Sequence, residues 1–511
     1  MKKENERKKR LRITCKFNLL TGAYILGVLF LFGALSILCS CSDDKQLEHP
    51  NVLFIAVDDL RPELNCYGNK EIVSPNIDRL AENGVLFKHA YCQQAICMAS
   101  RASIFTGYYA NANQIYSCLS VDDLMPEALT INGFFKKSGY DVYAIGKLYH
   151  HQEDHVKQFG EGWLETQKLA QGETKGRGYL SEEALAALTP EGRGPAWEIA
   201  DVEDNEYRDG FYADWVVNKL NDLKTSEKPF FLGVGFQKPH LPFNAPTKYW
   251  DLYDPEQIET VDNPFFPENG SLYGKHNSGE LRNYTNIPQG NSEFSEEMQK
   301  QLIHGYKACV SYTDAQIGRV LDALEKNGLK ENTVVVLWGD HGWKLGEHGM
   351  WCKHTAFEVD TRGPLIISAP NIRQNVKTNA LAEYVDVFPT LVDLCGFEVP
   401  VHLQGQSLFP VLSDPDSSVK EQAFSIWPSY RGAGNDKSKK VIGYSVRNQK
   451  YRYTEWIRID SGEVMEKELF DHNVDPEENR NVVDNEKYED ELPELSELIK
   501  DFRERTENIE L

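Results

Sequence analysis

Asn51-Val52-Leu53-Phe54-Ile55-Ala56-Val57 is a continuous apolar run that stops abruptly at Asp58-Asp59. A run of this length is typical of a strand that is buried on both faces, as the central strands of parallel sheets are. Three later segments have the same character, and each ends at ionisable residues: 141–145 before Gly146-Lys147, 229–236 before Lys238-Pro239-His240, and 333–338 before Gly339-Asp340-His341.

Helical patterns lie between these strands. One helix is expected from Pro75 to Asn83, with Ser74 capping it and Gly84 ending it, and a long one from Ser295 to Lys326. Alternating strands and helices predict an α/β fold, in which a large, mostly parallel sheet is sandwiched by helices. A single Asp or His after a strand is usually a turn former. Four such strand ends together predict a functional site at the carboxyl edge of the sheet.

The chain divides by composition into two predicted domains. Residues 51–410 are expected to form the large N-terminal domain, which carries the predicted functional edge, with long excursions from the sheet at 151–228 and 251–294. Residues 411–511 form a smaller α+β domain with an antiparallel sheet. Its expected elements are short strands at 423–427, 441–446 and 450–456 and an amphipathic helix at 492–506.

The first 40 residues have the pattern of an export signal. Eight basic and two acidic residues crowd positions 2 to 16, and residues 17–38 are almost uncharged. Leu38-Cys39-Ser40-Cys41 resembles a bacterial lipobox, which predicts removal of residues 1–40, lipidation of Cys41 and a tether at 41–50. Cys39 is the alternative lipid site, and an uncleaved membrane anchor stays open because the apolar run is long enough to span a bilayer. The chain is thus expected to be an exported lipoprotein, periplasmic or on the cell surface.

Charge and cysteine content narrow the function. The net charge of −23 falls to about −29 without the first 40 residues, which argues against a nucleic-acid partner. Seven cysteines lie beyond Cys41, an odd number without a Cys-x-x-Cys pair. They predict neither a disulfide framework nor a zinc site.

Three carboxylates follow two of the predicted strands: Asp58, Asp59 and Asp340. Bringing them together without a cation would be costly through like-charge repulsion, so they predict a hard divalent metal with oxygen ligands. Ca²⁺ is the expected ion, with Mg²⁺ as the alternative. His341 would be an unusual fourth ligand for calcium.

Cys97-Met98-Ala99-Ser100-Arg101, followed by Thr106-Gly107, pairs a potential nucleophile with a cation four residues on. A thiol at a helix start beside an arginine sits in positive potential, which favours anionic or strongly polarised states. The alternative is a half-buried structural thiol.

Several blocks of the chain together resemble the type I, formylglycine-dependent sulfatases of the alkaline phosphatase superfamily, and within them most the iduronate-2-sulfatases. The resemblance extends from Asn51 into the C-terminal domain. Its blocks are Val57-Asp58-Asp59-Leu60-Arg61-Pro62, Gln93 to Arg101, Gly146 to His150, Lys238 to Phe243, Asp340 to Gly349 with Lys353, and Leu469-Phe470-Asp471.

The resemblance implies a role for each matching residue. A maturation enzyme would oxidise Cys97 to formylglycine, whose hydrate is the nucleophile. The metal would be held by Asp58, Asp59, Asp340 and His341 with the modified Cys97. Arg101 would fix the hydrated aldehyde, Lys147 and Lys353 would neutralise the sulfate, His240 would protonate the leaving alcohol and His150 would act as the base.

Two features of these blocks differ from the family pattern or leave a role open. The first is the pair His150 and His151, because two adjacent histidines leave it open which one contacts the substrate. The roles of His150 and His240 could also be exchanged. Ala99 stands where proline is commoner, although alanine is also accepted.

The substrate prediction comes from Asp340-His341-Gly342-Trp343 and Gln93-Gln94-Ala95, which are closest to the iduronate type. It is a 2-O-sulfated hexuronate, either iduronate, glucuronate or an unsaturated uronate, at the end of a heparin, heparan sulfate or chondroitin sulfate oligosaccharide. Arg61, His151 and Lys238 are the candidate partners of its carboxylate. The alternatives are a sulfatase of another carbohydrate or small ester, a phosphonate or phosphate monoester hydrolase, and a glycan-binding lipoprotein without activity.

Overall fold

The computed structural model describes residues 49–111, 120–150, 178–429 and 440–507. The predicted signal, the lipidation site and the tether up to residue 48 lie outside this range, as do Cys118 and His151. In the described part of the chain, no helix combines the length and the apolar character that a membrane crossing requires.

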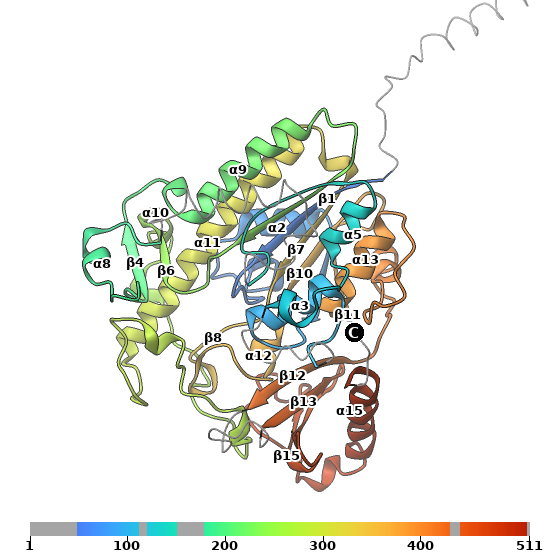
Figure 1. The fold of residues 1–511 in the computed structure, drawn as a ribbon. Coiled ribbons are helices and arrows are strands. Elements are labelled where there is room, and N and C mark those ends of the chain that lie inside the picture. Colours follow the sequence, from blue (N-terminus) through green and yellow to red (C-terminus); the bar gives the residue numbers. More distant parts are fainter. Residues whose placement is uncertain (1–48, 112–119, 151–177, 430–439, 508–511) are drawn as a thin grey trace, which may run out of the picture. The chain divides into compact units, whose positions relative to one another are not determined.

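The centre of the fold is a seven-stranded sheet in the order β11-β2-β10-β7-β1-β5-β3 (Figure 1). Strand β1 pairs in parallel with β5 and β7, and β3 continues the sheet beside β5. Only β10 runs antiparallel to its neighbours in this sheet. The predicted mostly parallel α/β sheet is therefore confirmed. Its strands are β1 (Asn51–Val57), β2 (Val85–Tyr91), β3 (Asp141–Gly146), β5 (Phe230–Phe236), β7 (Thr333–Gly339), β10 (Arg362–Ser368) and β11 (Val376–Glu383).

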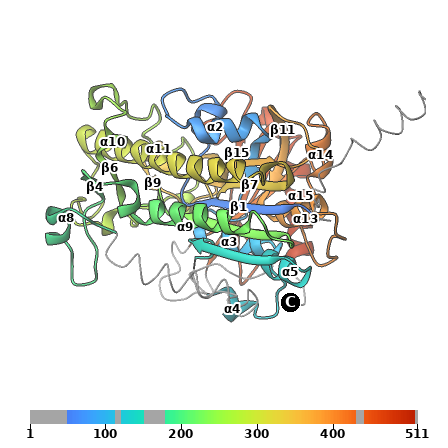
Figure 2. The same ribbon diagram turned by 90° about the horizontal axis from the view of Figure 1, so that it is seen from above.

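Helices cover both faces of this sheet because both faces of β1 are apolar. Leu53, Ile55 and Val57 pack into one buried cluster with α2 (Pro75–Glu82), α9 (Arg208–Leu223) and α11 (Glu296–Lys326). The alternate residues of β1 pack against α3 (Cys97–Thr106), α5 (Ile131–Lys137) and α13 (Val387–Leu394). Figure 2 shows α2 and α11 on one side of β1 and α3 and α5 on the other.

The start of α2 corrects one sequence prediction. Ser74 precedes the helix, but its side chain makes no capping hydrogen bond. The carboxylate of Asp314, on α11, instead accepts from the backbone N–H groups of Asn76 at 3.1 Å and Ile77 at 2.8 Å. A buried side chain from another helix therefore satisfies the free N–H groups of the first turn. The predicted cap of α11 is confirmed, since the Ser295 hydroxyl accepts from the N–H of Met298.

The predicted excursion at 151–228 is wrong in its last part. Residues 208–223 form α9, which lies beside α11 (Figure 1) and buries Tyr212, Val216 and Leu220. This helix belongs to the layer that covers the sheet. The later excursion at 251–294 holds short 3-10 turns at 255–257, 272–274 and 281–283, and an isolated β-bridge joins Glu268 to Arg480.

A second sheet lies in the C-terminal region, in the antiparallel order β12-β13-β14-β15. Its strands are β12 (Ala423–Ser429), β13 (Val441–Arg447), β14 (Tyr451–Arg458) and β15 (Val464–Asp471), and α15 (Leu492–Glu507) packs against it (Figure 1). The antiparallel sheet is confirmed, although β15 was not among the predicted strands. The domain boundary at residues 410 and 411 stays a prediction.

The remaining elements are short. They are α4 (Val121–Leu124), α8 (Glu182–Ala186), β4 (Trp197–Ala200), β6 (Phe243–Pro246), α10 (Thr247–Trp250), β8 (Lys344–Leu345), β9 (Trp351–Cys352), α12 (Glu358–Thr361) and α14 (Phe409–Ser413).

Candidate active site

The ends of β1 and β7 bring the three predicted carboxylates together. The Asp340 N–H donates to the carbonyl of Val57 at 3.2 Å, so the two strand ends stay in register. Asp59 has a φ of 61°, a left-handed conformation that non-glycine residues seldom adopt, and its N–H donates to Asp340 Oδ1 at 2.9 Å. Carboxylate oxygens of Asp58, Asp59 and Asp340 all lie within 4.8 Å of one another, and all three residues are buried.

Cys97 lies at the meeting point of this cluster. It is the first residue of α3, and its Sγ is 3.4 Å from His341 Nε2 and 3.9 Å from Asp59 Oδ1. His341 Nε2 is also 3.5 Å from Asp59 Oδ1 and 3.6 Å from Asp340 Oδ1. The five residues predicted to surround the metal therefore converge on one buried point.

The donor atoms of this cluster suit a divalent cation. His341 Nδ1 lies 2.9 Å from the Gly342 carbonyl, which can only accept, so Nδ1 carries the proton and Nε2 is free to act as a ligand. Burial lowers the pKa of His341 and keeps it neutral. Burial, together with the Asp58, Glu280 and Asp340 carboxylates, raises the pKa of Asp59 against the pull of Lys353. A metal ion would relieve this repulsion.

Arg101 is fully buried and holds two of the carboxylates. Its Nε donates to Asp340 Oδ2 at 2.9 Å and its Nη2 to Asp58 Oδ1 at 3.1 Å. Its Nη1 donates to the carbonyls of Lys147 and Leu148. Burial opposes the charged form, but Asp340 and Asp58 outweigh it and raise the pKa of Arg101. Arg101 thus acts in this structure as the clamp of the carboxylate cluster.

The surroundings of Cys97 in this structure favour the neutral thiol. Burial and the nearby Asp58 carboxylate raise its pKa well above the usual value, against the influence of Lys147 and Lys353. Burial and the neighbouring carboxylates thus outweigh the positive potential that the sequence predicts for this thiol. The guanidinium is already bound to the two aspartates, and the thiol faces carboxylates.

Two lysines border the cluster from different strands and loops. Lys147, just after β3, forms an ion pair with Asp58 Oδ2. Lys353 Nζ lies 2.9 and 3.2 Å from the two carboxylate oxygens of Asp59, and 4.8 Å from the centre of the Trp343 ring. In both cases burial opposes the charge, but the carboxylate partner outweighs it and raises the lysine pKa. Both ammonium groups therefore stay charged beside residue 97.

His240 lies at the mouth of this site, with a quarter of its side chain exposed. Its Nε2 is 3.4 Å from Glu280 Oε1 and 3.9 Å from Asp59 Oδ2, and its Nδ1 is 2.6 Å from the Leu241 carbonyl. Burial, with Lys353 and Lys147 nearby, lowers the pKa of His240 to about 3. Its neutral ring thus points Nε2 toward the carboxylates.

Glu280 belongs to the site although no sequence pattern indicates it. Its Oε1 accepts from Lys353 Nζ at 3.0 Å, and its Oε2 lies 3.7 Å from His354 Nε2. Burial opposes its charge, but Lys353, His240 and His354 outweigh burial and lower the pKa of Glu280. It comes from the polar excursion at 251–294, where a lone glutamate has no distinguishing neighbours in the sequence.

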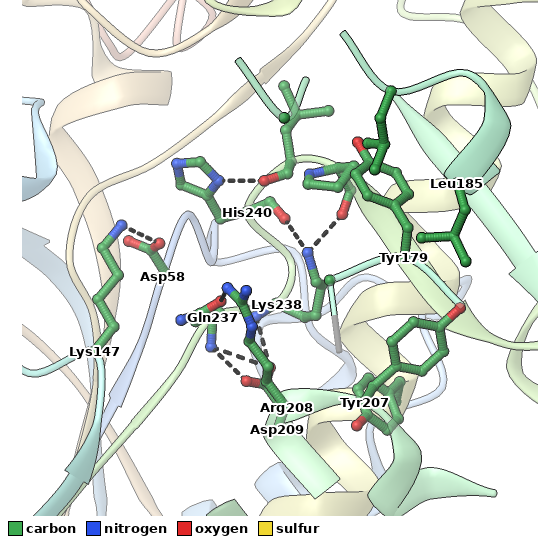
Figure 3. A pocket seen from close by; sticks show the side chains of 16 residues that line it. Asp58, Lys147, Tyr179, Leu185, Tyr207, Arg208, Asp209, Gln237, Lys238 and His240 are labelled. Atoms are coloured by element: carbon green, nitrogen blue, oxygen red, sulfur yellow. Dashed lines mark hydrogen bonds and ion pairs between the residues drawn. The ribbon is translucent and has the colours of Figure 1, made fainter. Parts of the chain in front are cut away.

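A cavity of about 430 Å³ opens beside the cluster. Figure 3 shows Asp58, Lys147 and His240 at one side and Tyr179 and Leu185 at the other. Its size is within the range of small-molecule sites, roughly 300 to 1,000 Å³. His150, which is half-buried, is not among the described residues that line the cavity, so its role as a base stays a prediction.

The six cysteines that the structure describes bear on the prediction that the chain has no disulfide framework. Cys66, Cys92, Cys97, Cys309, Cys352 and Cys395 are all free and buried. No disulfide links these six residues, as the sequence predicted.

Comparison with known proteins identifies the family of this chain. Residues 50–397 match the sulfatase family, and residues 346–505 match the C-terminal region of N-sulphoglucosamine sulphohydrolase. Iduronate 2-sulfatase of Mus musculus is 31% identical, over 86% of this chain and 91% of its own length. A sulfatase of Formosa agariphila is also 31% identical, over 89% of this chain and 87% of its own.

Solved structures of other proteins share this fold. A phosphonate monoester hydrolase of Silicibacter pomeroyi superposes with a TM-score of 0.72 and 23% identity, over 89% of this chain and 96% of that one. This likeness shows the fold alone, and it agrees with the α/β architecture predicted above. Because the family match covers most of the chain and the relatives align over nearly their full length, the protein is a member of the sulfatase family, whose chemistry is the hydrolysis of sulfuric esters.

Proposed function

We propose that this sulfatase removes the 2-O-sulfate of a hexuronate at the end of a glycosaminoglycan oligosaccharide. The convergence of Asp58, Asp59, Asp340 and His341 on Cys97 carries the proposal, because these are the groups that the family chemistry requires in one place. The similarity to iduronate 2-sulfatase over most of both chains supports the choice of sugar. Iduronate, glucuronate and unsaturated uronates all remain within this class.

Residue 97 is proposed to act as formylglycine rather than as a thiol. The high pKa of the Cys97 thiol supports this, since a neutral thiol is a weak nucleophile. A maturation enzyme would convert it, and the hydrate of the aldehyde would supply the attacking hydroxyl. Arg101 would hold the surrounding carboxylates in place while this happens.

The metal is proposed to be Ca²⁺, bound by Asp58, Asp59, Asp340 and His341 together with the modified residue 97. When bound, it would polarise a sulfate oxygen and favour ionisation of the attacking hydroxyl. Lys147 and Lys353 border the same point, so their ammonium groups can neutralise the other sulfate oxygens.

His240 is proposed to protonate the departing sugar hydroxyl. Its Nδ1 is held by the Leu241 carbonyl, so only Nε2 can face the substrate. The ring is neutral without substrate, so the acid role requires that Nε2 takes up a proton when the sulfate binds. Glu280, 3.4 Å from Nε2, favours the protonated ring, and an incoming sulfate would do the same. His150 is the proposed base in the second step, and the two histidines could exchange roles.

The compartment is part of the proposal as well. We infer an exported bacterial lipoprotein that is attached to a membrane through Cys41 and faces the periplasm or the cell surface. Radiolabelled palmitate incorporation by the wild-type protein, and its absence in Cys41→Ala, would test this attachment. Label that persists in Cys41→Ala and disappears in Cys39→Ala would move the lipid site to the runner-up cysteine.

A panel of disaccharides, each sulfated at one position, tests the substrate. We expect sulfate release from 2-O-sulfated uronate ends and none from 6-O- or N-sulfated glucosamine. Release only from the latter would contradict the proposal. Turnover of an aryl phosphate faster than the matching aryl sulfate would instead favour a phosphate or phosphonate monoester hydrolase.

A further inference from the structure

The cavity beside the metal cluster has a cation on its wall that the proposed chemistry does not use. From its place and its unused hydrogen-bonding capacity, we propose that Arg208 binds the carboxylate of the sulfated uronate and so selects uronates over neutral sugars. This inference rests on the proposed function, because it assigns the second charged group of the proposed substrate.

A 2-O-sulfated uronate carries two anionic groups on opposite sides of its ring. The sulfate is attached at C2 and the carboxylate at C5, so one cluster of cations cannot serve both. Lys147 and Lys353 already border residue 97, where the sulfate would react. A second cation is therefore needed about one sugar ring away from that point, within the same cavity.

Arg208 has a fixed place in this cavity. It is the first residue of α9 and lines the wall together with Lys147 and His240. The carboxylate of the next residue, Asp209, accepts from the backbone N–H groups of Gln237 at 2.9 Å and Lys238 at 2.7 Å. These bonds tie the start of α9 to the loop that carries His240.

The guanidinium of Arg208 has donors to spare. Figure 3 shows its side chain extending into the cavity beside Gln237, whose Oε1 accepts from Nη1 at a long 3.4 Å. Its Nε is buried and has no hydrogen-bond partner among the described residues. No carboxylate in that part of the chain forms an ion pair with it, in contrast to the fully paired Arg101. A planar fork of this kind matches a carboxylate in two parallel hydrogen bonds.

Two of the three cations that the sequence suggested for this role are bonded to other groups of the protein. Arg61 forms ion pairs with Glu347 at 2.6 Å and with Glu63. Lys238 Nζ donates to the carbonyls of His240 at 2.8 Å and Pro242 at 2.5 Å. His151 lies outside the described residues. Arg208 is therefore the better-placed partner among the residues that the structure describes.

The rest of the cavity suits a sugar ring. Its outer wall carries apolar groups of Tyr179, Leu185 and Leu188, which can cover the C–H faces of a pyranose. The Tyr179 hydroxyl donates to the Pro195 carbonyl at 2.7 Å, which orients its ring. An apolar wall opposite a few directed polar groups is the usual construction of a small-ligand site.

The test compares two substrates that differ only in the charged group. One is a disaccharide with a terminal 2-O-sulfated uronate, and the other is its carboxyl-reduced analogue, in which C6 is an alcohol. For the wild type we expect a higher kcat/KM on the uronate. In Arg208→Met the ratio of the two kcat/KM values should fall about 100-fold, mainly through KM, because a charged hydrogen-bonded contact is lost. In Arg208→Lys it should fall by about tenfold, because the charge stays but the fork is lost.

Controls separate the possible failures. Arg458→Gln, which removes a half-exposed arginine of the C-terminal sheet, should keep the wild-type ratio. An unchanged ratio in both Arg208 variants would overturn the inference while leaving the proposed function intact. If Arg208→Met fails to fold, the ratio in Arg208→Lys decides. A wild-type enzyme that cleaves aryl sulfates but neither disaccharide would overturn the proposed function, and the inference with it.

Discussion

The two walls of the site differ in how they are built. On the inner side, Asp58, Asp59, Asp340 and His341 follow directly from the ends of β1 and β7. On the outer side, Glu280 and Arg208 come from a polar loop and a helix start. The inner groups are positioned by hydrogen bonds between strands, and the outer ones by side-chain contacts between distant segments. The predicted metal-binding groups are thus placed by the ends of sheet strands, and the groups proposed to bind the substrate by a loop and by a helix that covers the sheet.

The largest effect should come from removing the nucleophile on the inner side. Cys97→Ala should lower kcat by at least about 10⁴-fold, because no attacking hydroxyl can form. Sulfate release measured by ion chromatography would show it. The matched control is Cys309→Ala, a buried cysteine of α11, which should keep kcat. In protein from a host with the maturation enzyme, the mass of the peptide that contains residue 97 should show that the cysteine sulfur has been replaced by oxygen. An active enzyme in which Cys97 is unmodified would contradict the proposal.

Metal removal tests the inner side as a cation site. Chelation should lower both kcat, by about a thousandfold, and Tm, because three buried carboxylates lose their common partner. Differential scanning fluorimetry should show Tm restored by Ca²⁺. In Asp59→Asn, the increase in Tm on addition of Ca²⁺ should be smaller. A Tm that is the same with chelator and with Ca²⁺ would argue against a resident metal.

Substitution of Arg101 tests whether the inner side depends on the arginine that binds Asp58 and Asp340. Arg101→Gln should lower stability by about 3–5 kcal/mol, because the buried Asp58 and Asp340 lose a charged partner. The free energy of unfolding in urea measures this, and kcat should fall about a hundredfold in parallel. Arg458→Gln, at an exposed ion pair, should change stability by less than about 1 kcal/mol. Equal losses in the two variants would remove the special role of Arg101.

Substitution of Glu280 tests the outer side of the site, and it should change kcat least. Its carboxylate raises the pKa of His240, so Glu280→Gln should lower that pKa. If His240 is the acid, the alkaline limb of the kcat profile then moves to lower pH, with about a tenfold loss of kcat at neutral pH. A profile that keeps its alkaline limb would show that Glu280 does not act on the acid.

Glu280→Gln also changes how stability depends on pH. Lys353, His240 and His354 lower the pKa of Glu280 below its usual 4.5 despite burial. Its ionised form therefore contributes stability above about pH 4.5, and this contribution is lost as the pH falls. Below that pH the wild type should lose stability more steeply than the variant, as acid titration followed by circular dichroism would show.

Secondary structure was predictable where one local signal was strong. The four apolar runs that end in ionisable groups are β1, β3, β5 and β7, and the helix after Ser295 is α11. Strands β2 and β10 were not indicated. In β2, Lys88 and His89 interrupt the apolar pattern. Strand β10 begins with Arg362-Gly363-Pro364, and glycine and proline disfavour strands. Both form because their neighbours in the sheet supply partners.

The sequence by itself determined the family, the parallel core and the residues that meet at the carboxyl edge of β1 and β7. It could do so because backbone geometry carries residues after parallel strands to one edge, whatever the loops do. Only the tertiary structure decided that Asp314 caps α2, that Glu280 reaches Lys353 and that Arg208 in the cavity wall forms no ion pair with a carboxylate of the described residues. These contacts join residues far apart in the chain, and no local pattern encodes which of many similar charged side chains will meet.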